Sequence, residues 1–445
     1  MRDILLIAVV SGFSLVALFR PFVGIVFFVW LGFFNPQSYT WSVAQTLPLS
    51  YITAVSTVIG FFISGEAKQF LLRRESILLL MLWAVFGLSS LTAFYPDLAA
   101  DRLISISKIL LMVFLTILLT TNKSRLDALL RAIALSLGFY GLKGGVFAIA
   151  TGGQALVFGP ENSFLEANNA IGLALAMNIP LLYYLLRIET RTWLRWVIKA
   201  MMWASFPAVI CTYSRGAWLG LAIVSVLLLL KSRHKFVVVA LAGVFLALSY
   251  GTLPQMLPDR LFSRYDQLVN YEKDDSAESR LWNWEFCKRV GLARPLTGGG
   301  FNFYSMETHA RYYPEFLERW PEKEWTCHSA WLTVFGEHGF PGFILWISLL
   351  VCCLLTLRQI RAYGKTRPEI SWIPVFADAI QISFVAYMVV GTFLDAAYFD
   401  MFYYLVAMVI VGKEIALAVL QPAPASSLIP ASAITAPVLG GARLT

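Results

Sequence analysis

Residues 340–357 read FPGFILWISLLVCCLLTL and contain no charged side chain. An uninterrupted apolar run of this length crosses about 30 Å of hydrocarbon as a helix, because a helix rises about 1.5 Å per residue. Arg358 and Arg361 follow the run directly. Because Lys and Arg collect on the cytoplasmic side of membrane helices, the sequence predicts a span here whose amino-terminal end faces away from the cytoplasm.

Comparable apolar runs recur along most of the chain and predict an all-α polytopic membrane protein. Charged residues make up only 14% of the chain, whereas soluble domains carry about a quarter. The runs are continuous rather than alternating, which excludes a transmembrane β-barrel and favours helices that satisfy their own backbone. The predicted spans lie near residues 4–19, 22–35, 50–65, 76–94, 103–121, 128–150, 168–186, 196–213, 216–231, 236–253, 340–357, 372–394 and 401–420.

The number of crossings depends on the first two runs. Arg20 and Pro21 separate them, because proline ends a helix and arginine resists burial in a bilayer. If every predicted span crosses, there are thirteen crossings and the N-terminus lies outside. If 4–35 supplies only one net crossing, both termini lie in the cytoplasm and about twelve transmembrane helices cross, which we favour. The tail 421–445 is rich in Pro, Ala and Ser and is predicted to be a disordered cytoplasmic segment.

The net charge of +8 is distributed among short loops. Five of these loops are basic and alternate with loops poor in Lys and Arg, so the positive-inside rule assigns them to the cytoplasm. Their basic residues are Lys68, Arg73 and Arg74; Lys123 and Arg125; Arg187, Arg191 and Arg195; Lys231, Arg233 and Lys235; and Arg358, Arg361, Lys365 and Arg367. This distribution argues against binding of nucleic acid, which needs one basic stripe. The segments that then face outward are 95–102, 151–167, 213–216, 254–339 and 395–400.

The segment 253–339 separates two groups of predicted spans, 1–252 and 340–420, and is the longest polar stretch of the chain. Long ordered loops usually carry function, so we expect this outward-facing loop to be catalytic. Asp275 and Glu278 have the spacing of a helix-capping box, and aromatic and charged residues alternate after them. The sequence predicts an amphipathic helix there that lies along the membrane surface.

Three cationic side chains are candidates for binding an anion. Arg215 lies at an outer membrane edge, in Thr212-Tyr213-Ser214-Arg215-Gly216; the positive-inside rule and the glycine favour an anion site over a snorkelling arginine. Arg280 opens the predicted surface helix and is equally consistent with a solvated face. Lys143, in Gly141-Leu142-Lys143-Gly144-Gly145, places a charge inside an apolar run, which predicts either a functional site or a snorkelling lysine. Asn168 and Asn169 follow an outer loop and are expected to cap the next helix.

Two of the four histidines precede the span at 340–357. His328 and His338 would point about 80° apart on one helix, so both could address one pocket, and a structural histidine is the alternative for each. His234 and His309 are predicted to be structural. Neither His328 nor His338 has a Cys or carboxylate partner at metal-ligand spacing, so no metal site is expected. The five cysteines likewise predict no framework of disulfides.

The order of these motifs is similar to that of a known family. Ser214-Arg215-Gly216 follows a mid-chain span, Arg280 lies in a large outer loop, and His328-Ser329-Ala330-Trp331 leads to Gly336-Glu337-His338-Gly339-Phe340-Pro341-Gly342. This pattern resembles the O-antigen ligase and polymerase superfamily, in which His-Asn is usual where this chain has His328-Ser329. Within it, the chain looks like the exosortase-associated O-glycosylation ligases, through Arg20-Pro21-Phe22-Val23-Gly24, Asn35-Pro36, Gly141-Leu142-Lys143-Gly144-Gly145 and Gly159-Pro160 before Asn168-Asn169.

The resemblance implies a metal-independent, inverting glycosyltransferase with a membrane-embedded fold of the C type and no cofactor. The implied donor is a glycan on undecaprenyl diphosphate, and the implied acceptor is a lipid A-core sugar, as in lipopolysaccharide biosynthesis. The implied location is the bacterial inner membrane, with a periplasmic active site in the loop 253–339. The resemblance assigns the base to His328 first and His338 second. It assigns binding of the diphosphate to Arg215 and Arg280, together with Lys143 and Tyr213.

Other functions remain open at this point. A repeat-unit polymerase would use a second lipid-linked glycan as acceptor, and a protein O-oligosaccharyltransferase would use Ser or Thr. A transporter of lipid-linked glycan would also be polytopic, but it would more often have internal repeats, charges near the midplane and short outer loops. The long outer loop favours the enzyme, and only Lys143 favours the transporter.

Overall fold

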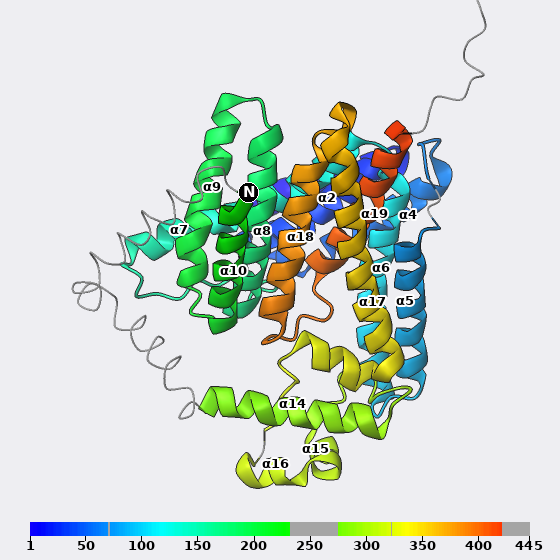
Figure 1. Ribbon diagram of the computed structural model, residues 1–445, viewed down its shortest axis with the longest axis vertical. Coiled ribbons are helices and arrows are strands. Elements are labelled where there is room, and N and C mark those ends of the chain that lie inside the picture. Colours follow the sequence, from blue (N-terminus) through cyan, green and yellow to red (C-terminus); the bar gives the residue numbers. More distant parts are fainter. Residues whose placement is uncertain (70–71, 232–274, 322, 421–445) are drawn as a thin grey trace, which may run out of the picture.

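The computed structural model describes residues 1–69, 72–231, 275–321 and 323–420. Within these residues every regular element is a helix and none is a strand, which confirms the all-α fold (Figure 1). The predicted span 236–253, His234 and the tail 421–445 lie outside the described residues.

Each predicted span within the described residues coincides with a helix. The helices are α1 (Arg2–Phe19), α2 (Pro21–Phe34), η1 (Pro36–Tyr39), α3 (Val43–Thr46), α4 (Leu49–Ile63), α5 (Arg74–Leu91), α6 (Pro96–Leu119), α7 (Lys123–Ala150), α8 (Asn168–Ile188), α9 (Thr192–Ile210), α10 (Arg215–Lys231), α14 (Asp275–Ala293), α15 (Met306–Tyr312), α16 (Pro314–Arg319), α17 (Ala330–Thr366), η3 (Pro368–Ile370), α18 (Ile373–Gly391) and α19 (Asp400–Leu420). Eight of these described helices are long and apolar enough to cross a membrane. The figure of about twelve crossings stays a prediction.

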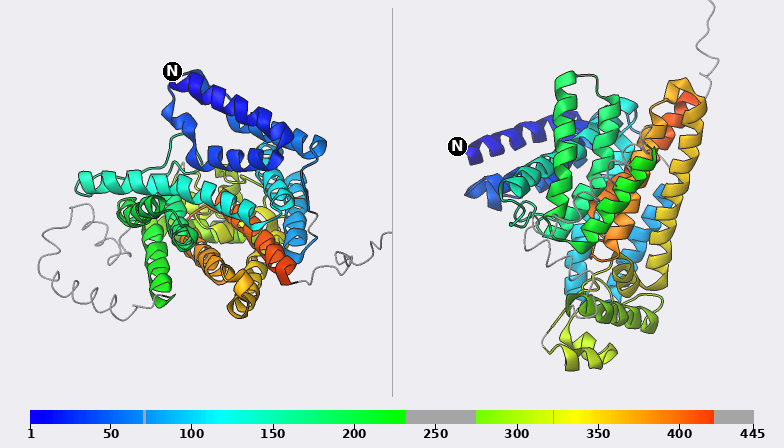
Figure 2. Two further views of the ribbon diagram at one scale, coloured as in Figure 1. Left: turned by 90° about the horizontal axis from the view of Figure 1, so that it is seen from above. Right: turned by 60° about the vertical axis from the view of Figure 1, so that its left-hand side comes forward.

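The break between the first two helices falls where the sequence predicts it. α1 ends at Phe19, and α2 begins at Pro21, whose missing N–H is tolerated at the first position of a helix. α1 and α2 pack against each other and against α4, and they lie along one side of the bundle (Figure 2). Gly60 of α4 permits this approach, because a Cβ there would lie 2.1 Å from the carbonyl oxygen of Ala17.

The 37-residue helix α17 is interrupted at Gly339, where φ is 62° and ψ is −160°. A side chain at this position would be strained by the positive φ, and a Cβ would lie 2.4 Å from the carbonyl oxygen of Pro295. The Phe340 amide donates to the same carbonyl at 2.8 Å. The break therefore joins the first turns of α17 to the chain segment that follows α14.

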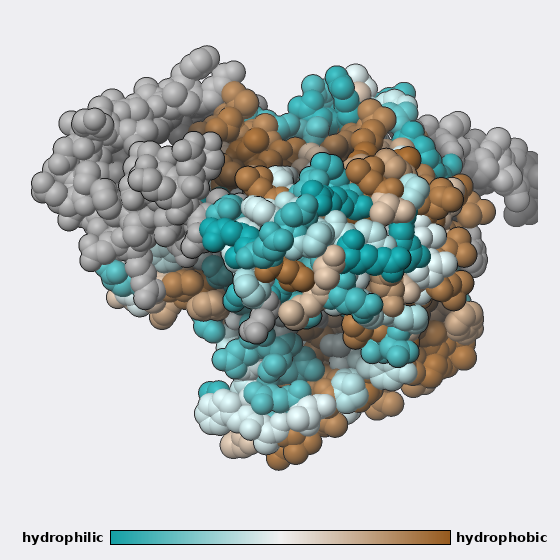
Figure 3. Space-filling model, turned by 90° about the horizontal axis from the view of Figure 1, so that it is seen from below, coloured by the Kyte–Doolittle hydropathy of each residue, from teal (hydrophilic) through white to brown (hydrophobic). Residues whose placement is uncertain are grey.

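A layer of shorter helices covers one end of the bundle. α14 lies across this end, and α15 and α16 lie beyond it (Figures 1 and 2). A helix therefore lies in the predicted segment, and its place along the membrane surface stays a prediction. Seen from below, hydrophilic residues occupy much of the centre of this end, and hydrophobic residues lie toward its edges (Figure 3). The layer has a small core of its own, built from Phe286, Val290, Phe303 and Phe316.

A disulfide joins Cys287 of α14 to Cys327, which lies just before α17. The expectation of no disulfide is therefore wrong. The two cysteines stand 40 residues apart in sequence, and only the packing of α14 across the bundle end brings their Cα atoms within 5.9 Å. Cys211, Cys352 and Cys353 are free thiols in the bundle.

Candidate functional site

His328 and Asp395 form a hydrogen-bonded pair at the end of the bundle that α14 covers. His328 follows the disulfide, has a φ of 50° and keeps 39% of its side chain exposed. Its Nδ1 lies 3.1 Å from Oδ2 of Asp395, in the loop 392–399 between α18 and α19. The hydroxyl of Thr333 donates to Oδ1 of the same carboxylate at 2.9 Å, and that of Thr326 donates to Oδ2. The carboxylate is thereby fixed while the imidazole stays accessible.

The surroundings of Asp395 keep this carboxyl ionised. Partial burial raises its pKa, but the hydrogen bond and charge of His328, with the hydroxyls of Thr326 and Thr333, outweigh burial and lower the pKa below its usual value. A carboxylate beside Nδ1 favours the tautomer in which that nitrogen carries the proton. The Nε2 atom of His328 is then the nitrogen that can accept a proton.

The loop 392–399 also contacts the two helices that carry the candidate arginines. Phe393 packs on Gly216, where a Cβ would lie 3.4 Å from the Cβ of Phe393. The ring of Phe393 also lies 6.1 Å, centroid to centroid, from that of Trp284. Gly216 follows Arg215, and Trp284 lies one turn after Arg280. The structure thus brings the start of α10, the middle of α14 and His328 to one loop.

The turn between α9 and α10 is held by several polar contacts. Tyr213 has a φ of 54°, is almost fully buried and donates its hydroxyl to the carbonyl of Gly153. Asn168 donates its side-chain amide to the carbonyl of Thr212 at 2.8 Å. Asn168 is therefore not the predicted cap of α8, whose N-cap is Ala167 without a side-chain hydrogen bond. The contacts fix the point at which α10 begins with Arg215.

Lys143 lies in a different part of the bundle, exposed on α7. Its Nζ is 3.3 Å from the hydroxyl of Tyr39 and 5.0 Å from the centre of that ring. The neighbouring glycines serve helix packing, since a Cβ at Gly145 would lie 2.2 Å from the carbonyl oxygen of Ala204 in α9. The structure places Lys143 beside η1, and its role at the diphosphate stays a prediction.

His338 is completely buried in the first turns of α17. Its Nδ1 lies 2.6 Å from the hydroxyl of Ser89, and its Nε2 lies 2.7 Å from the hydroxyl of Tyr398. The rings of Phe86 and Phe301 pack against it, with centroids at 4.4 and 4.5 Å. Because both nitrogens already bond protein groups and neither is exposed, this geometry favours His328 as the base and a structural role for His338.

Two further candidate residues, Asp395 and Glu337, were not predicted from the sequence. Asp395 is a carboxylate in a short loop between two apolar runs, and a single acidic residue at such a place is not a specific signal of function. Glu337 is buried beside His338, and its oxygens accept hydrogen bonds from Tyr304, Tyr398 and the Asn302 amide. This carboxylate links the start of α17 to the loop after α14. Among the described residues, no group of three His, Cys, Asp or Glu side chains is arranged to hold a metal ion.

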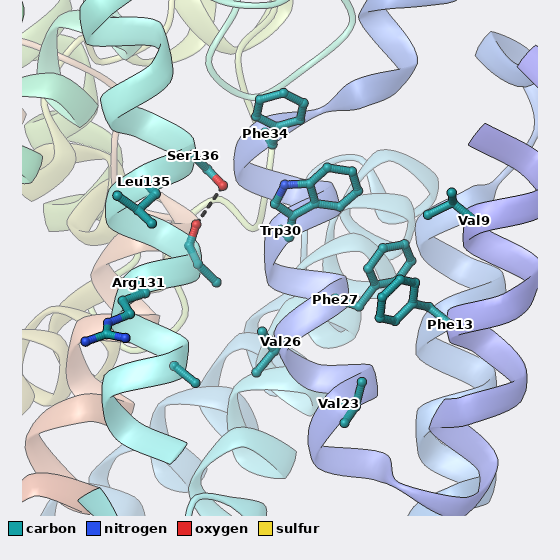
Figure 4. A pocket seen from close by; sticks show the side chains of 12 residues that line it. Val9, Phe13, Val23, Val26, Phe27, Trp30, Phe34, Arg131, Leu135 and Ser136 are labelled. Carbon is teal, nitrogen blue, oxygen red and sulfur yellow. Dashed lines mark hydrogen bonds between the residues drawn. The ribbon is translucent and has the colours of Figure 1, made fainter. Parts of the chain in front are cut away.

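An apolar groove of about 610 Å³ lies between α1 and α2 on one side and α7 on the other (Figure 4). Phe13, Phe27, Trp30 and Phe34 line it with stacked rings, and Arg131 lies on its α7 side. Phe33, next to Phe34, contacts Phe164, whose ring in turn contacts Phe399 of the loop 392–399. Aromatic packing therefore connects the groove region to the loop that carries Asp395.

Two models of known families match parts of this chain. Residues 200–347 match a family model described as O-antigen ligase, and residues 1–190 match a family of unknown function (DUF5935). No curated protein matches the chain. The O-antigen ligase match contains Arg215, Arg280 and both candidate histidines, so the predicted superfamily is confirmed, while the exosortase-associated subgroup stays a prediction. The match over residues 200–347 supports the O-antigen ligase superfamily and, with it, a ligase- or polymerase-type glycosyltransferase function in the membrane.

Proposed function

We propose that this membrane glycosyltransferase moves a glycan from undecaprenyl diphosphate to a hydroxyl of a lipid A-core sugar. The reaction takes place on the periplasmic face of the bacterial inner membrane and inverts the anomeric carbon. The observation that carries the proposal is the partly exposed imidazole of His328, which Asp395 holds at a loop that contacts both the helix of Arg215 and the helix of Arg280.

The proposed chemistry uses His328 as general base. The acceptor hydroxyl attacks the anomeric carbon, its proton passes to Nε2 of His328, and the bond from that carbon to the diphosphate oxygen breaks. The diphosphate leaves with the electron pair. Asp395 stabilises the imidazolium that forms, in the manner of a carboxylate that orients a catalytic histidine. A positioned base contributes about 10² to 10⁴ in rate.

Arg215 and Arg280 are proposed to neutralise the leaving diphosphate in place of a metal ion. Guanidinium groups stay charged, and their forked donors match phosphate oxygens. The sugar-diphosphate bond supplies the driving energy, so the transfer needs no nucleotide and no cofactor. Tyr213 supports binding of the diphosphate by fixing the turn that positions Arg215. Lys143 is proposed as a further cation that binds the diphosphate headgroup of the lipid.

Two features support the orientation and the lipid substrate. Disulfides persist in oxidising compartments such as the periplasm, and the Cys287–Cys327 bridge lies at the same end as His328. The polyprenyl chain of the donor needs an apolar surface that is reached from the bilayer, and the groove between α2 and α7 offers one.

Transfer reconstituted in lipid nanodiscs tests the proposal. Purified protein, a glycan on undecaprenyl diphosphate and lipid A-core are incubated with EDTA, and the product is analysed by mass spectrometry and by NMR of the new glycosidic bond. We expect an inverted linkage on the lipid A-core sugar, and none with His328→Ala. Transfer to a protein or to a second lipid-linked glycan would instead show that lipid A-core is not the acceptor. Loss of activity in EDTA with rescue by Mg²⁺ would refute metal independence.

A further inference from the structure

Asn283 of α14 is a buried polar side chain without a hydrogen-bond partner. It is 0% exposed, and neither its amide nitrogen nor its amide oxygen bonds any group among the described residues. The next residue repeats the pattern, because the indole nitrogen of Trp284 is also buried and unpaired there. Nearly all buried polar groups in proteins have a partner, so three such atoms on adjacent residues need an explanation.

The position of Asn283 places it between the proposed diphosphate site and the proposed base. Residues three and seven apart share a face of a helix, so Arg280, Asn283 and Cys287 lie along one side of α14. Cys287 is bonded to Cys327, the residue directly before His328. Along the helix axis Asn283 stands about 4.5 Å beyond Arg280 and about 6 Å before Cys287.

The chemistry of the unpaired atoms matches a sugar better than a phosphate. An amide presents a donor and an acceptor side by side, and hydroxyl and acetamido groups of sugars offer both functions in return. Phosphate oxygens at neutral pH only accept, and guanidinium groups serve them better. The indole of Trp284 adds one more donor, and its ring is held by Phe393 of the loop 392–399.

We infer that Asn283, with the indole N–H of Trp284, binds the first sugar of the lipid-linked donor. This inference rests on the proposed function, since that sugar is attached directly to the diphosphate assigned to Arg280. One turn of α14 would then hold both parts of the donor, with Arg280 on the diphosphate and Asn283 on the adjoining sugar. The anomeric carbon between them faces the side of α14 that the disulfide ties to His328.

A binding experiment with two probes tests the inference. Affinity of the protein in nanodiscs is measured for undecaprenyl diphosphate carrying one N-acetylhexosamine and for undecaprenyl diphosphate without sugar. Asn283→Leu preserves side-chain size but removes both hydrogen-bonding functions. We expect it to weaken binding of the sugar-bearing lipid about tenfold, as for one or two neutral hydrogen bonds, and to leave binding of the sugar-free lipid unchanged. Arg280→Lys should weaken both.

Asn178→Leu is the matched control, because Asn178 is equally buried but lies in α8, where its amide donates to the carbonyl of Ala134. It should leave the ratio of the two affinities at the wild-type value. Asn283→Leu should also keep the wild-type melting temperature or raise it, which separates binding from folding. An unchanged affinity ratio in Asn283→Leu would overturn the inference. Failure of the wild-type protein to bind either lipid would instead overturn the proposed function on which it rests.

Discussion

The Nδ1 atom of His328 lies 3.1 Å from Oδ2 of Asp395, although two long helices, α17 and α18, separate the residues in the chain. Hydroxyl donors on Thr326 and Thr333 hold the carboxylate from the other directions. A partly exposed histidine whose inner nitrogen is fixed by a carboxylate has its outer nitrogen available for proton transfer. This relationship underlies the first two predictions.

Replacing Asp395 by Asn should lower the transfer rate. The amide keeps the shape of the side chain but loses the charge that stabilises the imidazolium. Loss of one charge-assisted contact is worth about 1.5 to 3 kcal/mol, so kcat should fall about ten- to a hundredfold or slightly more. Asp378→Asn is the control, because Asp378 pairs with Lys231 and Arg361 near the first turn of the same α18. Equal rates in the two variants would contradict the role of Asp395.

Alanine variants of the two histidines should fail in different ways. His328→Ala should abolish transfer and leave the melting temperature near that of wild type, because the side chain is partly exposed. His338→Ala should lower the melting temperature strongly, since it opens a cavity beside Phe86 and removes one hydrogen bond from each of Ser89 and Tyr398. Thermal unfolding and transfer assays on both variants decide the matter. A stable but inactive His338→Ala with an active His328→Ala would exchange the roles.

Lysine in place of Arg215 or Arg280 should reduce transfer about ten- to a hundredfold, because a point charge cannot make a bidentate contact with a phosphate. Arg289→Lys is the matched control on α14, since Arg289 pairs with Glu285 and lies 4.0 Å from the centre of the Tyr313 ring. Rates are measured with the same lipid-linked glycan. Wild-type rates in both test variants would contradict the proposed role of Arg215 and Arg280 in binding the diphosphate.

Apolar runs and the proline break predicted the helices well, because a bilayer forces each span to satisfy its own backbone. The helix at α14 also followed from the capping spacing of Asp275 and Glu278. These are local properties of sequence. They do not depend on which helix packs against which.

The pairing of distant side chains could not be predicted in the same way. Cys287 and Cys327 carry no recognisable spacing, and Asp395 becomes a partner of His328 only through the packing of α17 on α18. Likewise, the two histidines look equivalent in sequence, yet one is partly exposed and the other is enclosed by aromatic rings. Burial separates them, and burial is a tertiary property.

The lowered pKa of Asp395 predicts a pH-dependent part of the stability. Because the carboxyl binds its proton more weakly in the folded than in the unfolded chain, its contribution is complete above the usual carboxyl pKa of about 4 and is lost as the pH falls further. Asp395→Asn lacks this contribution at every pH. Tryptophan fluorescence melts from about pH 7 to about pH 3 should therefore show the difference between the two proteins shrinking at acid pH. A constant difference would contradict the shift.

The disulfide predicts how α14 and His328 depend on each other. Cys287→Ser and Cys327→Ser each remove the bond, and the double variant should be no worse than either, because the two sulfurs act as one unit. Opening a loop of this length costs about 3 to 4 kcal/mol in the chain-entropy account, so the melting temperature should fall. The rate should also fall, since the residue before His328 is no longer tied to the helix of Arg280.

Cys352→Ser is the control for this comparison, because Cys352 is a free thiol within α17 and its loss should change neither quantity. Reduction of the wild-type protein should reproduce the double variant, and reoxidation should restore it. The bond itself is checked by maleimide-polymer labelling of the denatured protein, where Cys211, Cys352 and Cys353 should react before reduction and Cys287 and Cys327 only after it. Labelling of all the cysteines without a reductant would show that the bridge does not form. It would also refute the proposed coupling of α14 to His328.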